Sequence, residues 1–277
     1  MKPSTGAAEL RLGDGALGTE LLGWLRPDLP CVDLLNVFAP ERVQALHRAY
    51  WQAGARLLRS NSFCCDPDSL AGTPWAEHYD TLTRIAVCLL KKTLPQALIA
   101  GVLGPGWRLP GRNQIAPDQL YRIYCRRAAA VVAGGADIFW IETVQDPLQA
   151  EIAVQACMAV QPVLPLAVLV SPDADGQTVG GLPLDTVLQR LVALPLQILG
   201  VNCSWGPSAC LPALQWLRAH SPHALAVYPN GGLPDQPVVD WPVALLDIQR
   251  LYQPAWLGGC CGVGPAAIAR LRQDLSA

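Results

Sequence analysis

The chain of 277 residues is long enough for two average domains or for one large barrel. Its 20 basic and 22 acidic side chains give a net charge of −2, which excludes a basic surface for nucleic acid or an anionic membrane. Hydrophobic residues make up 51% and charged residues only 15%, so the composition excludes a disordered chain and predicts a large buried core.

Proline and glycine interrupt the apolar runs before they reach the roughly 20 residues that a membrane span needs. The first ten residues contain no apolar stretch typical of a signal peptide. Ten cysteines in a long chain without such a signal favour a reducing compartment over a disulfide framework. We therefore expect a soluble, cytoplasmic protein.

Short apolar runs alternate regularly with longer helical stretches. The apolar runs predict eight strands, at 10–13, 56–61, 98–102, 137–141, 166–170, 198–201, 225–228 and 255–257. Proline near the first turn marks the helix starts. Predicted helices cover 40–54, 73–93, 116–134 and 146–160, and four more begin at Pro183, Pro207, Asp240-Trp241-Pro242 and Pro265.

Dividing 277 residues among eight strand-helix units gives about 35 residues for each unit. This spacing is typical of a single α/β domain folded as a (β/α)8 TIM-type barrel, which we expect to span residues 1–277 because no linker interrupts the chain. A doubly wound parallel sheet is the alternative architecture.

Polar residues or glycines follow each predicted strand, where a barrel carries its chemistry. In chain order they are Asp14, Asn61-Ser62, Gly104-Pro105-Gly106, Glu142-Thr143, Ser171, Asn202-Cys203, Asn230-Gly231-Gly232 and Gly258-Gly259-Cys260-Cys261. The barrel topology predicts that these residues surround one mouth.

Three of these residues are cysteines from two strand ends, Cys203 and the pair Cys260-Cys261. Zn²⁺ binds thiolates in tetrahedral geometry, and three protein ligands with an open fourth position are typical of a catalytic site. Consecutive strand residues point to opposite faces, so both cysteines of the pair reach one metal only if the neighbouring glycines bend the chain. A buried turn without metal is the alternative. Cys64-Cys65 is a rival pair whose spacing matches no usual zinc pattern.

Further candidates at the mouth are acidic or aromatic. Glu142 and Asp14 could bind an ammonium group or act as bases, or could simply begin the following segments. Phe63, Trp107 and Trp205 lie in rim loops, where they could stack on a cationic ligand or serve in packing.

The segment 13–18 also matches the glycine fingerprint of dinucleotide-binding proteins, with Asp33 at the usual distance for the ribose. Asp14 would place negative charge where the pyrophosphate belongs, which disfavours this interpretation. All four histidines lie in predicted helices or in the loop before the seventh strand, away from the mouth, so a histidine-dependent nucleophile is also disfavoured.

These motifs resemble the homocysteine S-methyltransferase family, whose homocysteine-binding barrel is also the first module of cobalamin-dependent methionine synthase. The resemblance covers essentially the whole chain and rests on 14–19 (DGALGT), 60–63 (SNSF), 104–106 (GPG), 142–143 (ET), 200–203 (GVNC), 228–231 (YPNG) and 258–262 (GGCCG). It implies that Cys203, Cys260 and Cys261 hold zinc, and that Asp14 and Glu142 bind the amino group of homocysteine. Asn61 and Asn202 lie in matching segments and are predicted substrate contacts.

The resemblance also implies a reaction, in which the zinc-bound thiolate of homocysteine attacks an activated methyl group and yields methionine. We expect a small sulfonium donor, S-methylmethionine or S-adenosylmethionine, beside Phe63, Trp107 and Trp205. Open alternatives are a subunit that works with a separate corrinoid or folate methyl-donor protein, an enzyme acting on another thiol such as selenocysteine, and a non-catalytic zinc or thiol-binding relative.

The sequence departs from the family in three places. Ser60 and Ser62 stand where the family usually has threonines, a change that keeps the hydroxyls. After Gly262 the family usually has Thr-Thr-Pro-x-His, and Val263-Gly264-Pro265-Ala266-Ala267 here removes the hydroxyls and the histidine. Thr143 stands where the betaine-using branch has an aromatic residue, which disfavours betaine as the donor.

Overall fold

The computed structural model describes residues 10–26, 29–173, 175–178, 180–233, 236–237 and 241–276. Its main sheet has eight parallel strands in the order β1-β10-β7-β6-β5-β4-β3-β2. They are β1 (Arg11–Leu12), β2 (Leu57–Arg59), β3 (Leu98–Leu103), β4 (Ile138–Val144), β5 (Leu166–Val170), β6 (Ile198–Asn202), β7 (Ala224–Tyr228) and β10 (Trp256–Leu257).

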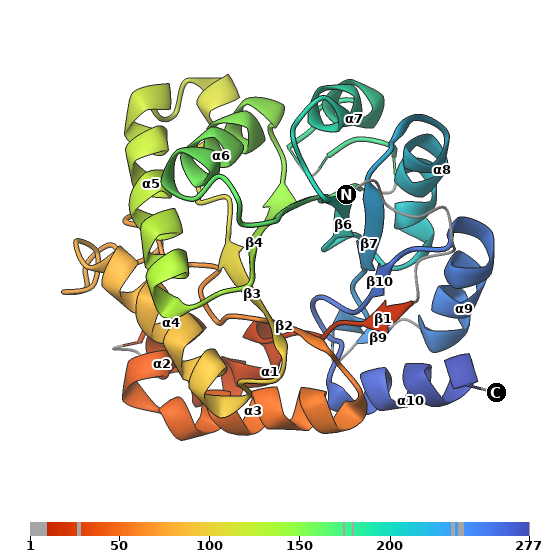
Figure 1. Ribbon diagram of the computed structural model, residues 1–277, viewed down its shortest axis with the longest axis horizontal. Helices are drawn as coiled ribbons and strands as arrows, with labels where there is room; N and C mark the ends of the chain where they lie inside the picture. The colour runs from red at the N-terminus through yellow and green to blue at the C-terminus, as the bar shows by residue number, and fades with distance from the viewer. Residues whose placement is uncertain are drawn as a thin grey trace.

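A parallel bridge between Gly13 and Leu57 connects the two outer strands, β1 and β2, and closes the sheet into a barrel. Figure 1 shows the helices arranged around this ring of strands. The predicted (β/α)8 barrel is confirmed, and the doubly wound alternative is wrong because its outer strands would remain apart.

The helices follow the strands in chain order. They are α1 (Gly18–Leu21), α2 (Leu35–Phe38), α3 (Pro40–Ala53), α4 (Tyr79–Thr93), α5 (Pro117–Gly134), α6 (Pro147–Val160), α7 (Leu184–Val192), α8 (Leu211–His220), α9 (Trp241–Tyr252) and α10 (Pro265–Ser276). Short 3₁₀ turns are η1 (Leu22–Trp24), η2 (Val32–Leu34), η3 (Pro110–Arg112) and η4 (Ser208–Cys210).

Proline begins four of the helices as predicted, because its fixed φ suits the first turn and its missing N–H has no helical partner there. The helix predicted over 73–93 begins only at Tyr79. Thr73 instead forms a local turn, with its hydroxyl donating to the Leu70 carbonyl and accepting from the Trp75 N–H. Such side-chain bonds compete with a helix start.

Two further differences lie near the later strands. Pro207 is followed by η4, and the regular helix α8 begins at Leu211. A hairpin of β8 (Gly232–Leu233) and β9 (Gln236–Pro237), which the sequence did not predict, follows β7. Of the helix start predicted at 240–242, residue 240 lies outside the described residues, and α9 begins at Trp241.

The core has two layers, one inside the barrel and one between the strands and the helices. Inside, the ring of Trp140 packs edge-on against that of Tyr228, with centroids 5.4 Å apart. Gly200 is required beside them, because a Cβ there would meet the backbone of Ala226. The two rings contact the charged residues of the mouth and form its floor.

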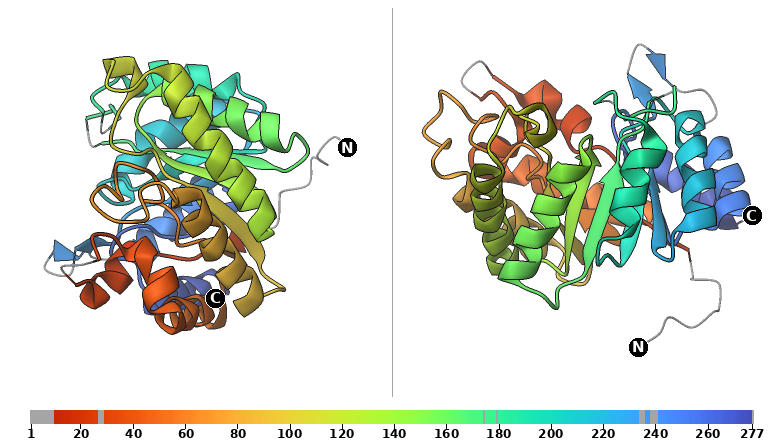
Figure 2. Two further views of the ribbon diagram at one scale, coloured as in Figure 1. Left: turned by 90° about the vertical axis from the view of Figure 1, so that its left-hand side faces the viewer. Right: turned by 90° about the horizontal axis from the view of Figure 1, so that it is seen from above.

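Loops at one end of the barrel extend beyond the strands. The right-hand view of Figure 2 shows the loop after β2, helix α1 and the β8–β9 hairpin at the same end. A separate apolar cluster ties the loops after β1 and β2 together, with Leu21, Leu34, Cys65 and Leu70 among its buried members. No helix within the described ranges is long and apolar enough to cross a membrane.

Candidate active site

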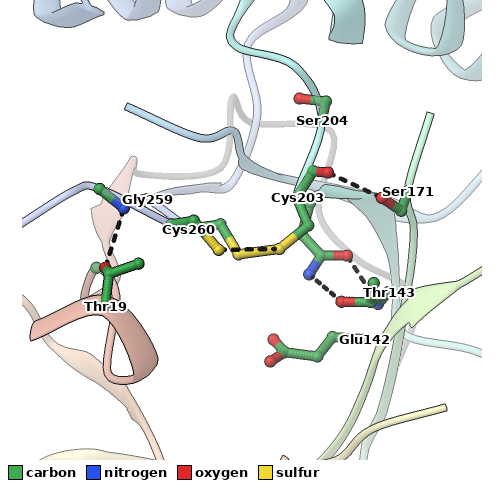
Figure 3. The surroundings of a disulfide bond; sticks show 12 residues. Thr19, Glu142, Thr143, Ser171, Cys203, Ser204, Gly259 and Cys260 are labelled. Atoms are coloured by element: carbon green, nitrogen blue, oxygen red, sulfur yellow. Dashed lines mark hydrogen bonds between the residues drawn. A yellow bond between two sulfur atoms is a disulfide. The ribbon is translucent and has the colours of Figure 1, made fainter. Parts of the chain in front are cut away.

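Three cysteines meet at the mouth of the barrel. Cys203 follows β6, Cys260 and Cys261 follow β10, and their three Sγ atoms all lie within 4.8 Å of one another. In the structure Cys203 and Cys260 form a disulfide (Figure 3). The Sγ of Cys261 lies 3.9 Å from that of Cys203. Once the disulfide is reduced, these sulfurs are a set that could hold a metal ion.

Within the described part of the chain, this is the one group of three or more metal-ligating side chains that lie so close together. The rival pair does not join this group: Cys64 is partly buried and lines the same cavity, and Cys65 is fully buried in the loop after β2. Burial raises the pKa of the Cys261 thiol, and the charge of Arg59 opposes this shift.

The backbone turns sharply at Cys203, which has a φ of 50°, in the left-handed region that few side chains adopt. Its N–H donates to the carbonyl of Tyr228 at 3.2 Å, and its carbonyl accepts from the hydroxyl of Ser171 at 2.9 Å. These two bonds, from the strands on either side of β6, hold the turn.

The glycines around the cysteine pair bend the second segment, as the sequence predicted. Gly262 has a φ of +76°, and a Cβ there would collide with the carbonyl oxygen of Gly232. Its N–H donates to the hydroxyl of Thr19 at 3.0 Å, while the N–H of Cys260 donates to the carbonyl of Pro229 at 2.9 Å. The turn is therefore fixed from the first and seventh strand ends.

A buried arginine occupies the centre of the mouth. Arg59, the last residue of β2, is only 4% exposed and lies over the ring of Tyr228. Its Nε donates to Asp14 Oδ1 at 2.7 Å, its backbone N–H donates to Asp14 Oδ2 at 2.8 Å, and its Nη1 donates to Glu142 Oε2 at 3.1 Å. The two predicted carboxylates are thus joined through one guanidinium.

Burial acts on these charges in opposite ways. It raises the pKa of the Asp14 carboxyl, and the charge and hydrogen bonds of Arg59 oppose that shift. Burial by itself would lower the pKa of Arg59, but the charges of Asp14 and Glu142 outweigh it and raise that pKa. Arg59 is therefore a permanent cation in the site.

Glu142 carries one free oxygen. Its Oε2 accepts from Trp140 Nε1 at 3.0 Å as well as from Arg59, whereas its Oε1 has no hydrogen bond among the described residues. The side chain extends from the end of β4 into the space beside Cys203 and Cys260 (Figure 3).

Arg59, Glu142 and the three cysteines line one cavity of about 160 Å³. Its polar and sulfur-bearing walls come from the ends of several strands, and apolar residues of the loops after β1 and β2 complete it. The lining includes Leu17, Thr19, Val32, Asp33, Arg59, Asn61, Phe63, Cys64, Glu142, Cys203, Cys260 and Cys261.

The family model of homocysteine S-methyltransferase matches residues 11–275. The chain belongs to the homocysteine S-methyltransferase family. This match confirms the family that the sequence predicted.

Relatives of two kinds agree with this family. Methionine synthases of Mycobacterium leprae and Mycobacterium tuberculosis are 28% and 27% identical, over 95% and 93% of this chain. The chain spans about a quarter of the length of these relatives (25% and 24%). The crystal structure of the metallated form of the homocysteine methyltransferase MmuM from Escherichia coli is 26% identical, with a TM-score of 0.77 and 96% of each chain covered. The oxidised form of the same protein has a TM-score of 0.78 at 25% identity, again over 96% of each chain.

Several residues that the sequence predicted as substrate contacts lie behind the cavity wall. Asp14 is fully buried, both of its oxygens bond Arg59, and neither it nor Asn202 is among the described residues that line the cavity. The amide of Asn202 accepts from the Thr143 N–H and donates to the Thr143 hydroxyl, both at 2.8 Å. Because Thr143 has a φ of 63°, these bonds fix the turn that follows Glu142.

Asn61 does line the cavity. Its Nδ2 donates to the backbone carbonyl of Val32 at 2.9 Å, and its backbone carbonyl accepts from Asn36 Nδ2 at 2.7 Å. Asn61 therefore joins the loops after β1 and β2, while its Oδ1 has no hydrogen bond within the described ranges.

The three predicted aromatic residues are placed differently. Phe63 lines the cavity, and Trp107 lines a neighbouring hollow that also includes Phe63. Trp107 is 73% exposed, and its Nε1 donates to the hydroxyl of Ser69 at 2.9 Å. Trp205 is 77% exposed and borders neither space among the described residues.

Sequence reasoning missed Arg59, although one sign was present. An arginine inside an otherwise apolar predicted strand has to find a buried partner. Asp33, noted only in the glycine fingerprint, lies in η2, where its Oδ2 accepts from the Cys64 N–H at 3.1 Å. Burial raises the pKa of Asp33 to about 7, and the Cys64 hydrogen bond and the charge of Arg127 oppose this shift.

Proposed function

We propose that this chain transfers a methyl group to the thiol of homocysteine and so forms methionine, with zinc bound by Cys203, Cys260 and Cys261. The observation that carries the proposal is the arrangement of three Sγ atoms within 4.8 Å at the wall of a cavity that also holds the free oxygen of Glu142. A ligand with a thiol at one end and an ammonium group at the other matches this pair of features.

The donor set suits zinc, because three thiolates are typical ligands of Zn²⁺ and leave a fourth position for a substrate thiol. Zinc bound there supplies a lowered pKa for that thiol, which keeps it as a nucleophilic thiolate near neutral pH. The disulfide between Cys203 and Cys260 removes two of the three ligands, so the active form requires both cysteines reduced.

The chain's own residues orient the acceptor. Glu142 Oε1 accepts a hydrogen bond from the substrate ammonium, Asn61 Oδ1 offers a second acceptor, and Asp14 contributes indirectly by holding Arg59. The thiol releases its proton to solvent on binding. In the transfer, a new carbon–sulfur bond forms to the acceptor thiolate while the donor's methyl–sulfur bond breaks and its electron pair stays on the donor sulfur.

We favour a small sulfonium, S-methylmethionine or S-adenosylmethionine, as the donor. Its positive charge makes the departing thioether a good leaving group without an acid catalyst, which suits a cavity whose described lining contains no histidine. Phe63 is the aromatic side chain at that wall and can contact the cationic sulfur. The alternative donor is a separate methylated corrinoid or folate protein, because the chain matches about a quarter of each methionine synthase.

The deciding experiment uses reduced protein reconstituted with zinc and measures methionine formation from homocysteine. S-Methylmethionine, S-adenosylmethionine and methylcobalamin are offered separately, with Cys203→Ser as the matched control. Turnover of a sulfonium by the wild-type protein, but not by the control variant, supports the proposal. Turnover only with methylcobalamin supports the corrinoid alternative. If no donor yields methionine although one zinc is bound per chain, the remaining interpretation is a non-catalytic zinc or thiol-binding relative.

A further inference from the structure

Arg59 is the strongest unassigned feature of the cavity. It is a fully charged side chain at the end of a barrel strand, 4% exposed, and it lines the same wall as Glu142 and the cysteine sulfurs. We propose that Arg59 binds the carboxylate of the acceptor amino acid and makes the site selective for thiols that carry both an ammonium and a carboxylate. The proposal rests on the proposed function and names the group that sets its acceptor specificity.

The hydrogen-bond count leaves Arg59 one donor to spare. A guanidinium has five N–H groups in a fixed plane. Nε donates to Asp14, Nη1 to Glu142 Oε2, and Nη2 to the carbonyls of Gly15 and Gly259 at 2.6 and 2.7 Å. One hydrogen of Nη1 therefore has no partner among the described residues.

The spare donor and the spare acceptor belong to bonded neighbours. Nη1 of Arg59 bonds Oε2 of Glu142, and the other oxygen of that carboxylate is free. An amino acid carries its ammonium and carboxylate on one carbon, so it can bond Glu142 and Arg59 together. A thiol with only one of these groups leaves the other partner unsatisfied in a buried site, which is costly.

The charges lead to the same conclusion. Asp14 and Glu142 without Arg59 would present two negative charges, an environment that favours a simple cationic amine. With Arg59 the net charge of the three groups is −1, and a positive group faces the ligand. The site therefore accommodates a zwitterion, which brings no net charge.

The backbone holds Arg59 in fixed relation to the metal ligands. Its Nη2 bonds the carbonyl of Gly259, the residue directly before Cys260, and its Nε bonds the fully buried Asp14. The distance between a carboxylate bound to Arg59 and a thiolate bound beside the cysteines is therefore fixed. Lysine cannot reproduce this arrangement, because it lacks the planar fork of donors.

The test compares three acceptors on the reduced, zinc-loaded wild-type protein: homocysteine, 3-aminopropanethiol, which lacks the carboxylate, and 4-mercaptobutyrate, which lacks the ammonium. The kcat/KM for thioether formation is measured with the active donor, and the affinity for each thiol is measured by calorimetry. We expect 3-aminopropanethiol to be at least about tenfold weaker than homocysteine in both measurements, as expected for the loss of one charge-assisted contact.

Arg59→Gln should lower the affinity and the kcat/KM for homocysteine and 4-mercaptobutyrate by about tenfold or more. The same two quantities for 3-aminopropanethiol should stay unchanged or rise. Glu142→Gln is the matched control and should show the reverse pattern, weakening 3-aminopropanethiol but not 4-mercaptobutyrate. If Arg59→Gln does not fold, as judged by circular dichroism, Arg59→Lys is the second variant, because it keeps the charge but not the planar fork of donors. It should also lose affinity mainly for homocysteine and 4-mercaptobutyrate, the two thiols that carry a carboxylate.

Two results would overturn the proposal: wild-type protein that binds 3-aminopropanethiol as well as homocysteine, or a folded Arg59 variant that weakens all three thiols equally. The second result would mean that Arg59 only supports the fold of the site. Absence of turnover with every thiol would count against the proposed function, while the calorimetric comparison would still decide the role of Arg59.

Discussion

Asp14→Asn tests how much the buried charges at the barrel mouth stabilise the fold. Asp14 is fully buried and makes two charge-assisted bonds with Arg59, from Nε at 2.7 Å and from the backbone N–H at 2.8 Å. Asparagine keeps the shape, but its amide removes the negative charge and turns an NH₂ group toward one of these donors. The guanidinium then remains buried with Glu142 as its single carboxylate partner.

Two routes give a similar magnitude. Breaking a buried ion pair by removing one partner costs about 3–5 kcal/mol of the free energy of unfolding. Two hydrogen bonds to charged groups, at about 1.5–3 kcal/mol each, sum to about 3–6 kcal/mol. At roughly 2–4 °C for each kcal/mol in a chain of this size, the melting temperature should fall by about 6–20 °C.

Chemical denaturation of the reduced protein measures this free energy. Glu151→Gln is the matched control, because Glu151 forms a bond of similar length with Arg190, 2.7 Å, but on the surface, with side chains 25% and 45% exposed. Such an exposed pair is worth at most about 1 kcal/mol. The double variant Asp14→Asn/Arg59→Gln should be less destabilised than the sum of its single variants, by up to about 3 kcal/mol.

A cost for Asp14→Asn no larger than that of Glu151→Gln would refute this reasoning. Burial raises the pKa of Asp14, so that result would mean that the carboxyl is protonated in the folded protein and contributes no ion pair. Strict additivity in the double variant would likewise show that Asp14 and Arg59 do not stabilise each other.

Four further predictions concern the metal, the substrates and the pH dependence. Reduced wild-type protein should bind about one zinc per chain, less tightly at acid pH because protons compete for the thiolates, and Cys203→Ser should lower the zinc content measured by metal analysis. Glu142→Gln should lower kcat/KM for homocysteine by about tenfold or more, and unchanged kinetics would remove Glu142 from the substrate site. Phe63→Leu should raise the donor KM by a few-fold and the homocysteine KM less, and equal effects on both would exclude cation–π contact with the donor. Trp205→Leu is the control, because Trp205 borders neither space among the described residues, and it should change neither KM. His47 is buried, and neither of its ring nitrogens has a hydrogen bond to the described residues. Burial, with the charge of Arg48, lowers its pKa from 6.5 to about 3. The unfolded chain therefore binds more protons between those values, so the free energy of unfolding should fall by about 2 kcal/mol from pH 7 to pH 5, and much less in His47→Leu.

The sequence by itself determined the elements that depend on local signals. All eight strands were predicted within a few residues, because each is a short apolar run bounded by polar or glycine residues. Proline marked the starts of α3, α5, α6 and α10. The start of α4 was predicted wrongly, because the hydroxyl of Thr73 bonds its own turn instead of beginning a helix.

The meeting of the three cysteines was also within reach of the sequence. In a parallel barrel the carboxyl ends of all strands lie at one mouth, so Cys203 and the pair Cys260-Cys261 converge once the strand count is known. The sequence did not predict the role of each polar residue at these strand ends. Asn202 occupies a matching motif, yet its amide supports Thr143 and does not line the cavity.

Only the tertiary structure decided the charges of the site. Arg59 bonds Asp14, 45 residues away along the chain, and Glu142, 83 residues away, and neither pairing leaves a local pattern in the sequence. The pairing arises because closure of the barrel brings β1, β2 and β4 to a single mouth, where a buried guanidinium is stable only between carboxylates. The same closure gave Asp14 a supporting position behind Arg59, and it left Glu142 with one oxygen free toward the cavity.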